Sequence, residues 1–320
     1  MNIAYSTDNN YVKYLGISMI SLLENNRNLE INIYIIDNGI NDKNKEILNN
    51  IAKNYNAKIT YLDFKELTKN LKTDNTYPVS SYGRIFLSVL NLDKIIYLDC
   101  DSIIADSLED LDNIDISDYY IAGVQDTVTN FFKTSIGLNK DDRYINAGML
   151  VINLKKWRED KIEEKCLQYI DKCKGSVPHH DQGTINAICS SKMLILHPKY
   201  NLMTPMFYKA EQNKKLYDMK EYYEQKELDE AIQNPVFIHY TNGFFNRPWN
   251  ADCTHPLKNI FLKYMNMSPW KGQIEENKLN KNAQIMKKLH KILPFNIYCI
   301  FSKIIMKRKE RKWKKKIRTH

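Results

Sequence analysis

A short hydrophobic segment that ends in two carboxylates constrains the fold of this chain more than any other feature. Residues 95–98 are Ile-Ile-Tyr-Leu, and Asp99, Cys100 and Asp101 follow them directly. An apolar run of this length bounded by charge is typical of a buried strand in an α/β sheet. Side chains at the carboxyl end of such a strand reach the crevice where open α/β sheets bind ligands. Asp99 and Asp101 are therefore candidate ligands of Mg²⁺ or Mn²⁺, which prefer oxygen and can hold a diphosphate.

The Asp-x-Asp pattern alone is common, and this chain contains a second copy at Asp110 and Asp112. No strand-like run precedes the second copy, so we interpret it as a solvated turn. The position of Asp99 and Asp101 at the end of a predicted strand indicates that this copy is functional and not a chance occurrence of the pattern.

Alternating strands and helices precede this segment. Residues 2–6, 31–36 and 58–62 have the pattern of strands, whereas residues 11–25 and a segment that begins after Asn41 repeat apolar side chains at helical spacing. Asn41 itself is a candidate helix N-cap. The alternation predicts a nucleotide-binding α/β half. Because neither a Gly-x-Gly-x-x-Gly motif nor a Walker loop follows the first strand, dinucleotides and ATP are disfavoured as ligands.

Polar side chains stand close to the ends of several predicted strands. Asp8 and Asn10 follow the first strand and can hydrogen-bond the edge of a base, although an ordinary Asx turn explains them equally well. Arg84, in a predicted helix over residues 82–90, can clamp a phosphate or a sugar hydroxyl, or pair with a surface carboxylate. His239 follows the last predicted strand, and a neutral imidazole there is a reasonable third metal ligand.

The second half of the chain continues the alternation. We expect a small-residue turn at 146–148 that leads into a buried strand, a helix over 155–172, and a helix that opens near His179. His179 and His180 are adjacent, but neighbours in a regular element cannot both face one metal ion. Residues 207–233 are charged and rich in tyrosine, which predicts exposed helices.

The net charge of +9 is concentrated at the C-terminal end. Residues 281–320 hold fourteen Lys or Arg and one acid, whereas residues 1–280 hold 33 basic and 37 acidic side chains. The mildly acidic body argues against a nucleic-acid-binding protein. Apolar residues from Ile285 to Ile305 recur at helical spacing on both sides of Pro294. This pattern predicts an interfacial helix with a polybasic end, attracted to an anionic membrane by about 1 kcal/mol per basic residue. A solvated tail or a lysine-rich helix that binds a partner protein is the alternative.

We expect one domain over residues 1–270 and a basic amphipathic helical tail over residues 271–320. The longest apolar stretch near the tail is far shorter than the roughly 20 residues of a membrane-spanning helix, and the N-terminus lacks the pattern of a signal peptide. The six cysteines include no Cys-x-x-Cys pair, so neither a zinc site nor a disulfide framework is indicated. The sequence predicts a cytoplasmic protein, peripheral on the inner face of the plasma membrane, without a nucleic-acid partner.

Six short stretches in a fixed order resemble family 8 of the glycosyltransferases. They are Ser6-Thr-Asp-Asn-Asn-Tyr11, Tyr82-Gly-Arg84, Tyr97-Leu-Asp-Cys-Asp101, Asn146-Ala-Gly148 with Asn153-Leu-Lys-Lys-Trp157, His180-Asp-Gln182, and His239-Tyr through Arg247-Pro-Trp249. The resemblance covers residues 1 to about 270, and six matches in one order form a strong signal. It implies a retaining enzyme of GT-A fold, a Rossmann-like mixed sheet flanked by helices, similar to bacterial lipooligosaccharide galactosyltransferases.

The resemblance also implies roles for particular residues. Asp99, Asp101 and His239 would hold Mn²⁺, with Mg²⁺ as the alternative, against the diphosphate of a UDP-sugar. The other implied contacts to the donor nucleotide and its phosphates are Ser6, Asp8, Asn10, Arg84, Gly243 and Arg247. The implied catalytic residues, which surround the donor sugar, are Arg84, Asn146, Asp181 and Gln182. Asp126 would contact the acceptor.

The implied activity is the transfer of galactose or glucose from a UDP-sugar to a glycan or lipid-linked saccharide in bacterial surface polysaccharide assembly. The chain departs from the family pattern in its last loop, which usually reads His-Tyr-x-Gly-x-x-Lys-Pro-Trp. Here the segment from His239 to Trp249 is longer, and Arg247 replaces the lysine. Arginine binds phosphate through a forked set of donors rather than a point charge.

Two other functions fit parts of the pattern. A haloacid-dehalogenase-type phosphatase also places Asp-x-Asp after a hydrophobic strand, but that family normally begins with this strand and has Thr or Val where Ile103 stands here. A non-catalytic membrane-surface scaffold would keep the fold without the chemistry.

Overall fold

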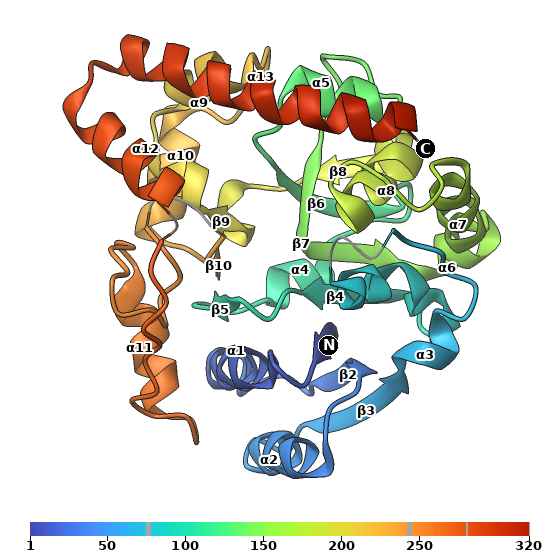
Figure 1. Ribbon diagram of the computed structural model, residues 1–320. Coiled ribbons are helices and arrows are strands. Elements are labelled where there is room, and N and C mark those ends of the chain that lie inside the picture. Colours follow the sequence, from blue (N-terminus) through green and yellow to red (C-terminus); the bar gives the residue numbers. More distant parts are fainter. Residues whose placement is uncertain (75–77, 242–244, 280, 320) are drawn as a thin grey trace.

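The computed structural model describes residues 1–74, 78–241, 245–279 and 281–319 (Figure 1). A seven-stranded mixed sheet forms its centre, with the strand order β3-β2-β1-β4-β7-β6-β8. A smaller sheet has the order β5-β10-β9. Helices flank the central sheet, which confirms the predicted α/β fold class.

The first half of the chain alternates strands and helices as predicted. Its strands are β1 (Asn2–Asp8), β2 (Asn32–Asn38), β3 (Lys58–Asp63), β4 (Lys94–Leu98) and β5 (Ser102–Ile104). Its helices are α1 (Val12–Asn25), α2 (Asp42–Lys53), α3 (Phe64–Leu67), the 3₁₀ helix η1 (Val79–Val89) and α4 (Glu109–Asn113). The predicted N-cap is confirmed, because the side chain of Asn41 accepts a hydrogen bond from the N–H of Asn44. The predicted turn at Asp110 and Asp112 is wrong: both residues belong to α4, where Asp110 accepts a hydrogen bond from the Tyr200 hydroxyl.

β1 and β4 are parallel neighbours at the point where the strand order reverses. From β1 the chain moves outward to β2 and β3, and it then returns to β4 on the other side of β1. Ile3 pairs with Ile96, so both strands end at the same edge of the sheet. A crevice forms where connections diverge from two such strands, and ligands commonly bind there.

The second half adds antiparallel strands and the tail. Its strands are β6 (Ile121–Gln125), β7 (Ile145–Asn153), β8 (Met193–Ile195), β9 (Leu202–Met203) and β10 (Phe237–His239). The α-helices up to the tail are α5 (Asn130–Ser135), α6 (Leu154–Glu159), α7 (Ile162–Lys172), α8 (His180–Cys189), α9 (Ala210–Tyr217), α10 (Gln225–Gln233) and α11 (Lys258–Asn266). The 3₁₀ helices are η2 (Ser190–Lys192), η3 (Pro198–Tyr200) and η4 (Thr204–Phe207).

Three local predictions in this half are wrong. Residues 146–148 lie inside β7, which pairs antiparallel with β4 and β6, and they form no turn. The helix expected over 155–172 is two helices, because Lys161 has a left-handed φ of 51° that an α-helix cannot continue through. The expectation of exposed helices over 207–233 fails at Tyr222 and Tyr223, which are buried. The Tyr223 hydroxyl donates a hydrogen bond to the carbonyl of Leu196, so its burial leaves it satisfied.

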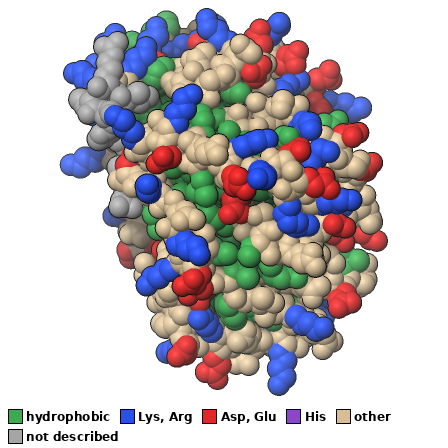
Figure 2. Space-filling model, turned by 90° about the vertical axis from the view of Figure 1, so that its right-hand side faces the viewer, with side chains coloured by type: hydrophobic (Ala, Val, Ile, Leu, Met, Phe, Trp, Pro, Cys, Tyr) green, Lys and Arg blue, Asp and Glu red, His purple; other side chains and the backbone are tan. Residues whose placement is uncertain are grey.

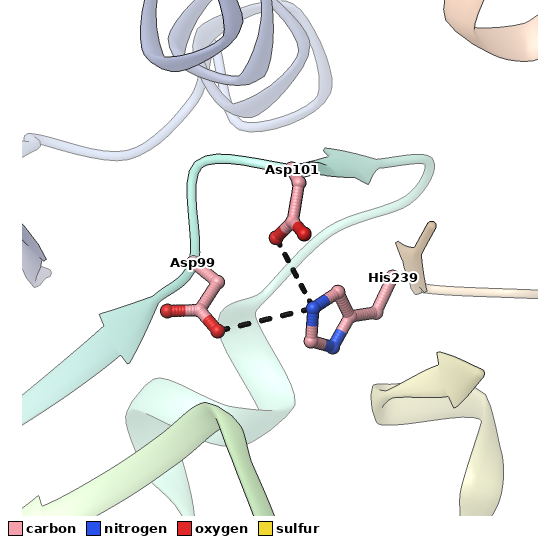
Figure 3. Close-up of side chains that lie close together, drawn as sticks. All are labelled: Asp99, Asp101 and His239. Atoms are coloured by element: carbon pink, nitrogen blue, oxygen red, sulfur yellow. Dashed lines mark ion pairs between the residues drawn. The ribbon is translucent and has the colours of Figure 1, made fainter. Parts of the chain in front are cut away.

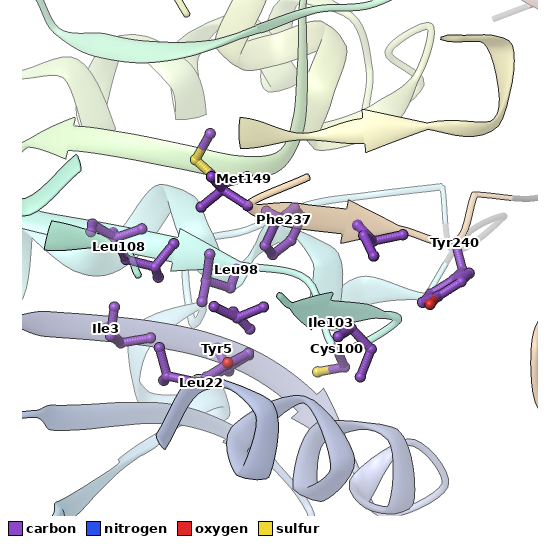
Figure 4. Close-up of a cluster of buried hydrophobic side chains, with 14 of the residues drawn as sticks. Ile3, Tyr5, Leu22, Leu98, Cys100, Ile103, Leu108, Met149, Phe237 and Tyr240 are labelled. Carbon is purple, nitrogen blue, oxygen red and sulfur yellow. The ribbon is translucent and has the colours of Figure 1, made fainter. Parts of the chain in front are cut away.

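A buried apolar cluster joins the two sheets to α1 (Figure 4). Ile3 of β1, Leu22 of α1, Ile103 of β5 and Phe237 of β10 all have no exposed surface. β4 is buried on both faces, since Ile96 and Leu98 belong to this cluster whereas Ile95 and Tyr97 belong to a second one. The shared core therefore fixes the ends of β4, β5 and β10 relative to one another.

The C-terminal residues form two helices, α12 (Lys281–Ile292) and α13 (Phe295–Thr319), on either side of Pro294, where apolar residues at helical spacing had predicted a helical tail. α13 crosses the top of the molecule in Figure 1, over α9 and beside α5. In Figure 2 basic side chains gather at the upper left, and acidic and basic side chains are interspersed over the rest of that face. Within the described ranges, no helix combines the length and the apolar character that a membrane crossing requires.

Candidate active site

Two aspartates and one histidine that are distant in the sequence converge at the end of β4 (Figure 3). Asp99 follows β4 directly, and its N–H donates to the carbonyl of Gly148 at 2.7 Å. Asp101 precedes β5, which pairs antiparallel with β10 so that His239 lies opposite Ser102. Nε2 of His239 lies 3.1 Å from Oδ1 of Asp101 and 3.8 Å from Oδ2 of Asp99. The predicted group of three is thus assembled by strand pairing.

This group fits a divalent cation. One ligand atom from each of Asp99, Asp101 and His239 lies within 4.8 Å of the others. Two carboxylates and an imidazole suit Mn²⁺ or Mg²⁺ better than soft metals. Gly148 on β7 makes room for the imidazole, because a Cβ at this position would overlap Cε1 and Nδ1 of His239. The adjacent pair His179 and His180 belongs to no such group among the described residues.

Arg247 and His239 supply positive charge beside Asp101. Nη1 of Arg247 donates to Oδ2 of Asp101 and to the carbonyl of Tyr240. Burial alone would raise the pKa of Asp101, but Arg247 and His239 outweigh it and hold this pKa well below its usual value. Burial would lower the pKa of His239, but Asp101 and Asp99 outweigh it and raise this pKa. A cation at this site would meet two carboxylates, of which Asp101 is firmly ionised.

Arg84 connects the two sides of the site. Nη2 of Arg84 donates to Oδ1 of Asp99 at 2.8 Å, and Nε lies 3.1 Å from Oδ2 of Asp181. Its guanidinium stacks 4.3 Å from the ring centroid of Tyr97. Burial raises the pKa of Asp181, although Arg84 opposes this shift. The predicted alternative of a surface ion pair is wrong, because Arg84 is 4 % exposed and both of its carboxylate partners lie in the site.

A cavity of about 170 Å³ lies between the ends of β1 and β4. Of the residues implied for the donor, it is lined by Ser6, Asp8, Arg84, Asp99, Asp101 and Arg247. Asp8 also forms the Asx turn, accepting from the N–H groups of Asn10 and Tyr11. Asn10 is exposed and does not line the cavity. Gly243 lies outside the described residues.

A second cavity, of about 570 Å³, is lined by the other predicted residues, Asp126, Asn146, Asp181 and Gln182. Oδ2 of Asp126 accepts hydrogen bonds from Nδ2 of Asn146 and from Nε2 of Gln182, both at 3.0 Å. Oε1 of Gln182 accepts from the N–H of Ala147 at 3.0 Å. Both cavities contain Arg84 and Asp99 in their walls, so they meet at these two side chains.

Two residues of this site were not singled out from the sequence, and the role of a third was not predicted. Tyr11 lines the smaller cavity, and its only signal was its place at the end of the first matching stretch. Gly148 belongs to another matching stretch, but the sequence did not predict that its missing side chain makes room for His239. Trp313 of α13 lines the larger cavity, and nothing in the sequence around it indicates this position.

Comparisons with known proteins agree with this geometry. The sequence profile described as glycosyl transferase family 8 matches residues 2–253. The chain belongs to glycosyltransferase family 8. It is therefore a sugar-transferring enzyme, which argues against the phosphatase alternative.

Relatives of this family 8 member carry consistent names. A Haemophilus influenzae protein named as a glycosyltransferase is 33 % identical over 83 % of this chain and 78 % of its own length. An Escherichia coli lipopolysaccharide 1,2-glucosyltransferase is 28 % identical over 85 % of this chain and 79 % of its own. The solved structure of the galactosyltransferase LgtC with donor and acceptor sugar analogues matches at a TM-score of 0.70 and 22 % identity. That match covers 84 % of this chain and 96 % of LgtC and confirms the GT-A fold.

Proposed function

We propose that this enzyme transfers galactose or glucose from a UDP-sugar to a glycan or lipid-linked saccharide in the assembly of a bacterial surface polysaccharide. The observation that carries this proposal is the pair of cavities that meet at Arg84 and Asp99, with two members of the Asp99–Asp101–His239 group, Asp99 and Asp101, in the wall of the smaller one. The names of relatives support the acceptor class: an Escherichia coli lipopolysaccharide 1,2-glucosyltransferase and a Salmonella typhimurium lipopolysaccharide 1,3-galactosyltransferase.

We assign the smaller cavity to the UDP-sugar donor. Ser6 and Asp8 line its end at β1, where they can contact the nucleoside, and Arg247 lines its end at the metal ligands, where it can contact phosphate. Asp99, Asp101 and His239 fit Mn²⁺, with Mg²⁺ as the alternative. A divalent cation held there would stabilise the negative charge that the diphosphate gathers as the bond to the sugar breaks.

We assign the larger cavity to the acceptor and to the reacting sugar. Asp126, Asn146 and Gln182 form a hydrogen-bonded group on its wall, and Asp181 is paired with Arg84. This arrangement favours retention of configuration through attack on the same face. In that step the bond from the anomeric carbon to the phosphate oxygen breaks, the acceptor oxygen bonds to that carbon, and the acceptor proton passes to the leaving phosphate.

A covalent sugar–enzyme intermediate is less consistent with these contacts. Gln182 stands where a nucleophile would be sought, and its amide oxygen already accepts from the N–H of Ala147. An amide is also a weak nucleophile compared with a carboxylate. Detection of a glycosyl-enzyme adduct by mass spectrometry of the intact protein would contradict same-face attack.

We further propose that residues 1–270 form the catalytic domain and that residues 271–320 attach it to the inner face of the plasma membrane. On α13 a row of apolar side chains faces solvent, comprising Ile297, Ile300, Phe301 and Ile304, which are 43–61 % exposed. The surrounding residues 303–315 are predominantly basic. An apolar row flanked by positive charge complements an anionic bilayer surface.

The decisive experiment measures UDP release from a panel of UDP-sugars in the presence of Mn²⁺. We expect release from UDP-galactose or UDP-glucose, and its loss in Asp101→Asn, which keeps the size of the side chain but removes its charge. Absence of release from every UDP-hexose would overturn the proposal. Hydrolysis of a generic aryl phosphate by the same protein would instead support a phosphatase.

A further inference from the structure

We propose that α13 completes the acceptor site and that the indole of Trp313 is a stacking surface for a sugar ring of the acceptor. The inference rests on the proposed function only in taking the acceptor to be a saccharide. The tail would then bind the acceptor at the site of sugar transfer, in addition to attaching the protein to the membrane.

Trp313 lies in the wall of the larger cavity together with Asp126, Gln182 and Phe132. The ring of Phe132 packs on that of His179, with centroids 4.4 Å apart and an interplanar angle of 31°. The cavity therefore has aromatic walls beside a carboxylate–amide group. Its volume of about 570 Å³ is within the usual range for a small-molecule site.

The inward face of α13 places Trp313 there by regular helical spacing. Cys299 and Ser302 are buried against the body, and Met306, Glu310 and Trp313 continue the same face at intervals of three or four residues. The exposed isoleucines lie between these positions, on the outward side. The helix thus has an inward face of mixed polarity against the body and an outward apolar face in solvent.

Polar and cation–π contacts fix α13 to α5 and the residues before it, which line the cavity, and to the end of α9. Oε1 of Glu310 accepts a hydrogen bond from Oγ1 of Thr129 at 3.0 Å. Lys303 pairs with Asp218 at 2.5 Å. Nζ of Lys314 lies 5.1 Å from the ring centroid of Phe131, which neighbours Phe132. Because contacts lie on both sides of Trp313 along the helix, the indole is held at the cavity.

A pyranose ring has a C–H face that packs on aromatic rings and hydroxyls around its edge that need hydrogen-bond partners. The cavity offers Trp313 to the C–H face of such a ring. Its hydrogen-bonding groups for the hydroxyls are Asp126, Asn146 and Gln182. An anionic ligand is disfavoured, because Asp126 and Asp181 line the same space. A neutral sugar ring is therefore the chemistry that this cavity matches.

The two faces of α13 also suit a saccharide that is linked to a lipid. When the outward face lies on a bilayer, the inward face brings Trp313 to the acceptor cavity from the same helix. The sugar can then occupy the cavity while its lipid stays in the membrane. This geometry assigns the lipid-proximal end of the acceptor to the α13 side of the site.

The test uses the full-length protein in solution with UDP and diamagnetic Mg²⁺, and the probes are methyl β-glucopyranoside and methyl β-galactopyranoside. Saturation-transfer NMR with irradiation of the aromatic protons reports on ring contacts with the glycoside. We expect transfer to at least one glycoside in the wild type, roughly 3- to 10-fold weaker binding in Trp313→Ala, and recovery in Trp313→Phe. Met267→Ala removes a large exposed apolar side chain at the end of α11 and should leave the signal unchanged.

Release of UDP from UDP-hexose is measured separately, on wild-type protein without added UDP. An unchanged circular dichroism spectrum and thermal midpoint show that Trp313→Ala is folded, so a lost glycoside signal in that variant then supports the stacking surface. An unchanged signal in Trp313→Ala, or no aromatic transfer to either glycoside in the wild type, overturns it. Failure of the wild type to release UDP from any UDP-hexose defeats the proposed function instead, whatever the glycoside spectra show.

Discussion

At the scale of single residues, Gly148 decides whether the proposed metal site can form. Its missing side chain is the space that the imidazole of His239 occupies, and its carbonyl accepts the N–H of Asp99. One backbone position on β7 therefore touches two of the three candidate ligands. We predict that Gly148→Ala displaces the imidazole and weakens Mn²⁺ affinity by about 10- to 100-fold, the range seen when the supports of metal ligands are altered. Isothermal titration of the metal checks this prediction.

A double-mutant cycle separates this effect from general damage to β7. In a His239→Ala background the added methyl group has no imidazole to displace, so Gly148→Ala should then cost little further stability. An equal stability loss in both backgrounds would show that the methyl group clashes with something other than His239. The side chain of Asn146, which is also close to this position, is the first alternative to consider.

The ionisation of His239 predicts a pH-dependent response to metal. Asp101 and Asp99 raise its pKa in the folded protein, so in the absence of metal the protonated imidazole stabilises the fold below its ordinary pKa of about 6.5. That contribution is lost as the pH rises through the raised pKa. Because a metal binds only the neutral imidazole, the increase in Tm on adding Mn²⁺ should be larger at about pH 8 than at about pH 6.

Thermal denaturation with EDTA or Mn²⁺ measures this difference directly. His239→Gln removes the titrating group and should make the effect of Mn²⁺ on Tm much less dependent on pH. An increase in Tm that is the same at both pH values in the wild type would contradict a role for His239 as a ligand.

At the scale of elements, the pairing of β10 with β5 carries His239 to the aspartates. Ile238 is fully buried between its partners Ile103 and Leu202 in this small sheet. Ile35 of β2 is equally buried, but β2 is separated from β4 by β1 and does not belong to the small sheet that carries His239. We predict that Ile238→Ala and Ile35→Ala each lower the free energy of unfolding by about 2–5 kcal/mol. Only Ile238→Ala should also weaken Mn²⁺ binding. Urea denaturation measures the stability of each variant, and metal titration measures its Mn²⁺ affinity. An equal loss of Mn²⁺ affinity in Ile35→Ala would show that the pairing of β5 with β10 has no special role in positioning His239.

The same elements show what a sequence can and cannot reveal. The run Ile95–Leu98 predicted a buried strand because both of its faces are apolar, and the position of Asp99 and Asp101 followed from that strand. The place of His239 after a predicted strand made it a candidate third ligand, but only the family resemblance implied that it joins Asp99 and Asp101, since strand pairing between β5 and β10 leaves no local pattern. Residues 146–148 were misjudged because small residues favour both turns and tightly packed strands, and only the neighbouring strands decide between them.

The position of Trp313 could not be predicted for a related reason. Its neighbours from Lys307 to Arg318 are nearly all basic, so local composition indicates a solvated or membrane-bound segment. The inward face of α13 becomes recognisable only after α9 and the loop at Thr129 are in place. Periodicity and motifs do not show roles that depend on long-range packing, such as the space that Gly148 leaves for His239 and the position of Trp313.

At the scale of the whole molecule, charge is separated between a mildly acidic body and a strongly basic tail. The body repels an anionic bilayer weakly, whereas the tail attracts it, so the protein should bind in one orientation with α13 toward the lipid. The outward apolar row on α13 would then enter the interface, while its inward face stays on the acceptor cavity. If both proposals hold, attachment and acceptor binding depend on different faces of one helix and can be altered separately.

This separation predicts two independent components of vesicle binding. Binding to vesicles that contain phosphatidylglycerol should fall steeply between about 0.05 and 0.5 M salt, because the Debye length shortens several-fold over this range. Binding to phosphatidylcholine vesicles should be much weaker at every salt concentration.

The double variant Ile300→Ser with Ile304→Ser should weaken the binding that persists at high salt, while Val89→Ser, at an exposed apolar site on the body, should not. UDP release from the soluble donor should be unchanged in all these variants. Sedimentation of the protein with vesicles measures binding in each case. Vesicle binding that does not change with salt would contradict the electrostatic contribution. An equal loss of high-salt binding in Val89→Ser would contradict an apolar contact through α13.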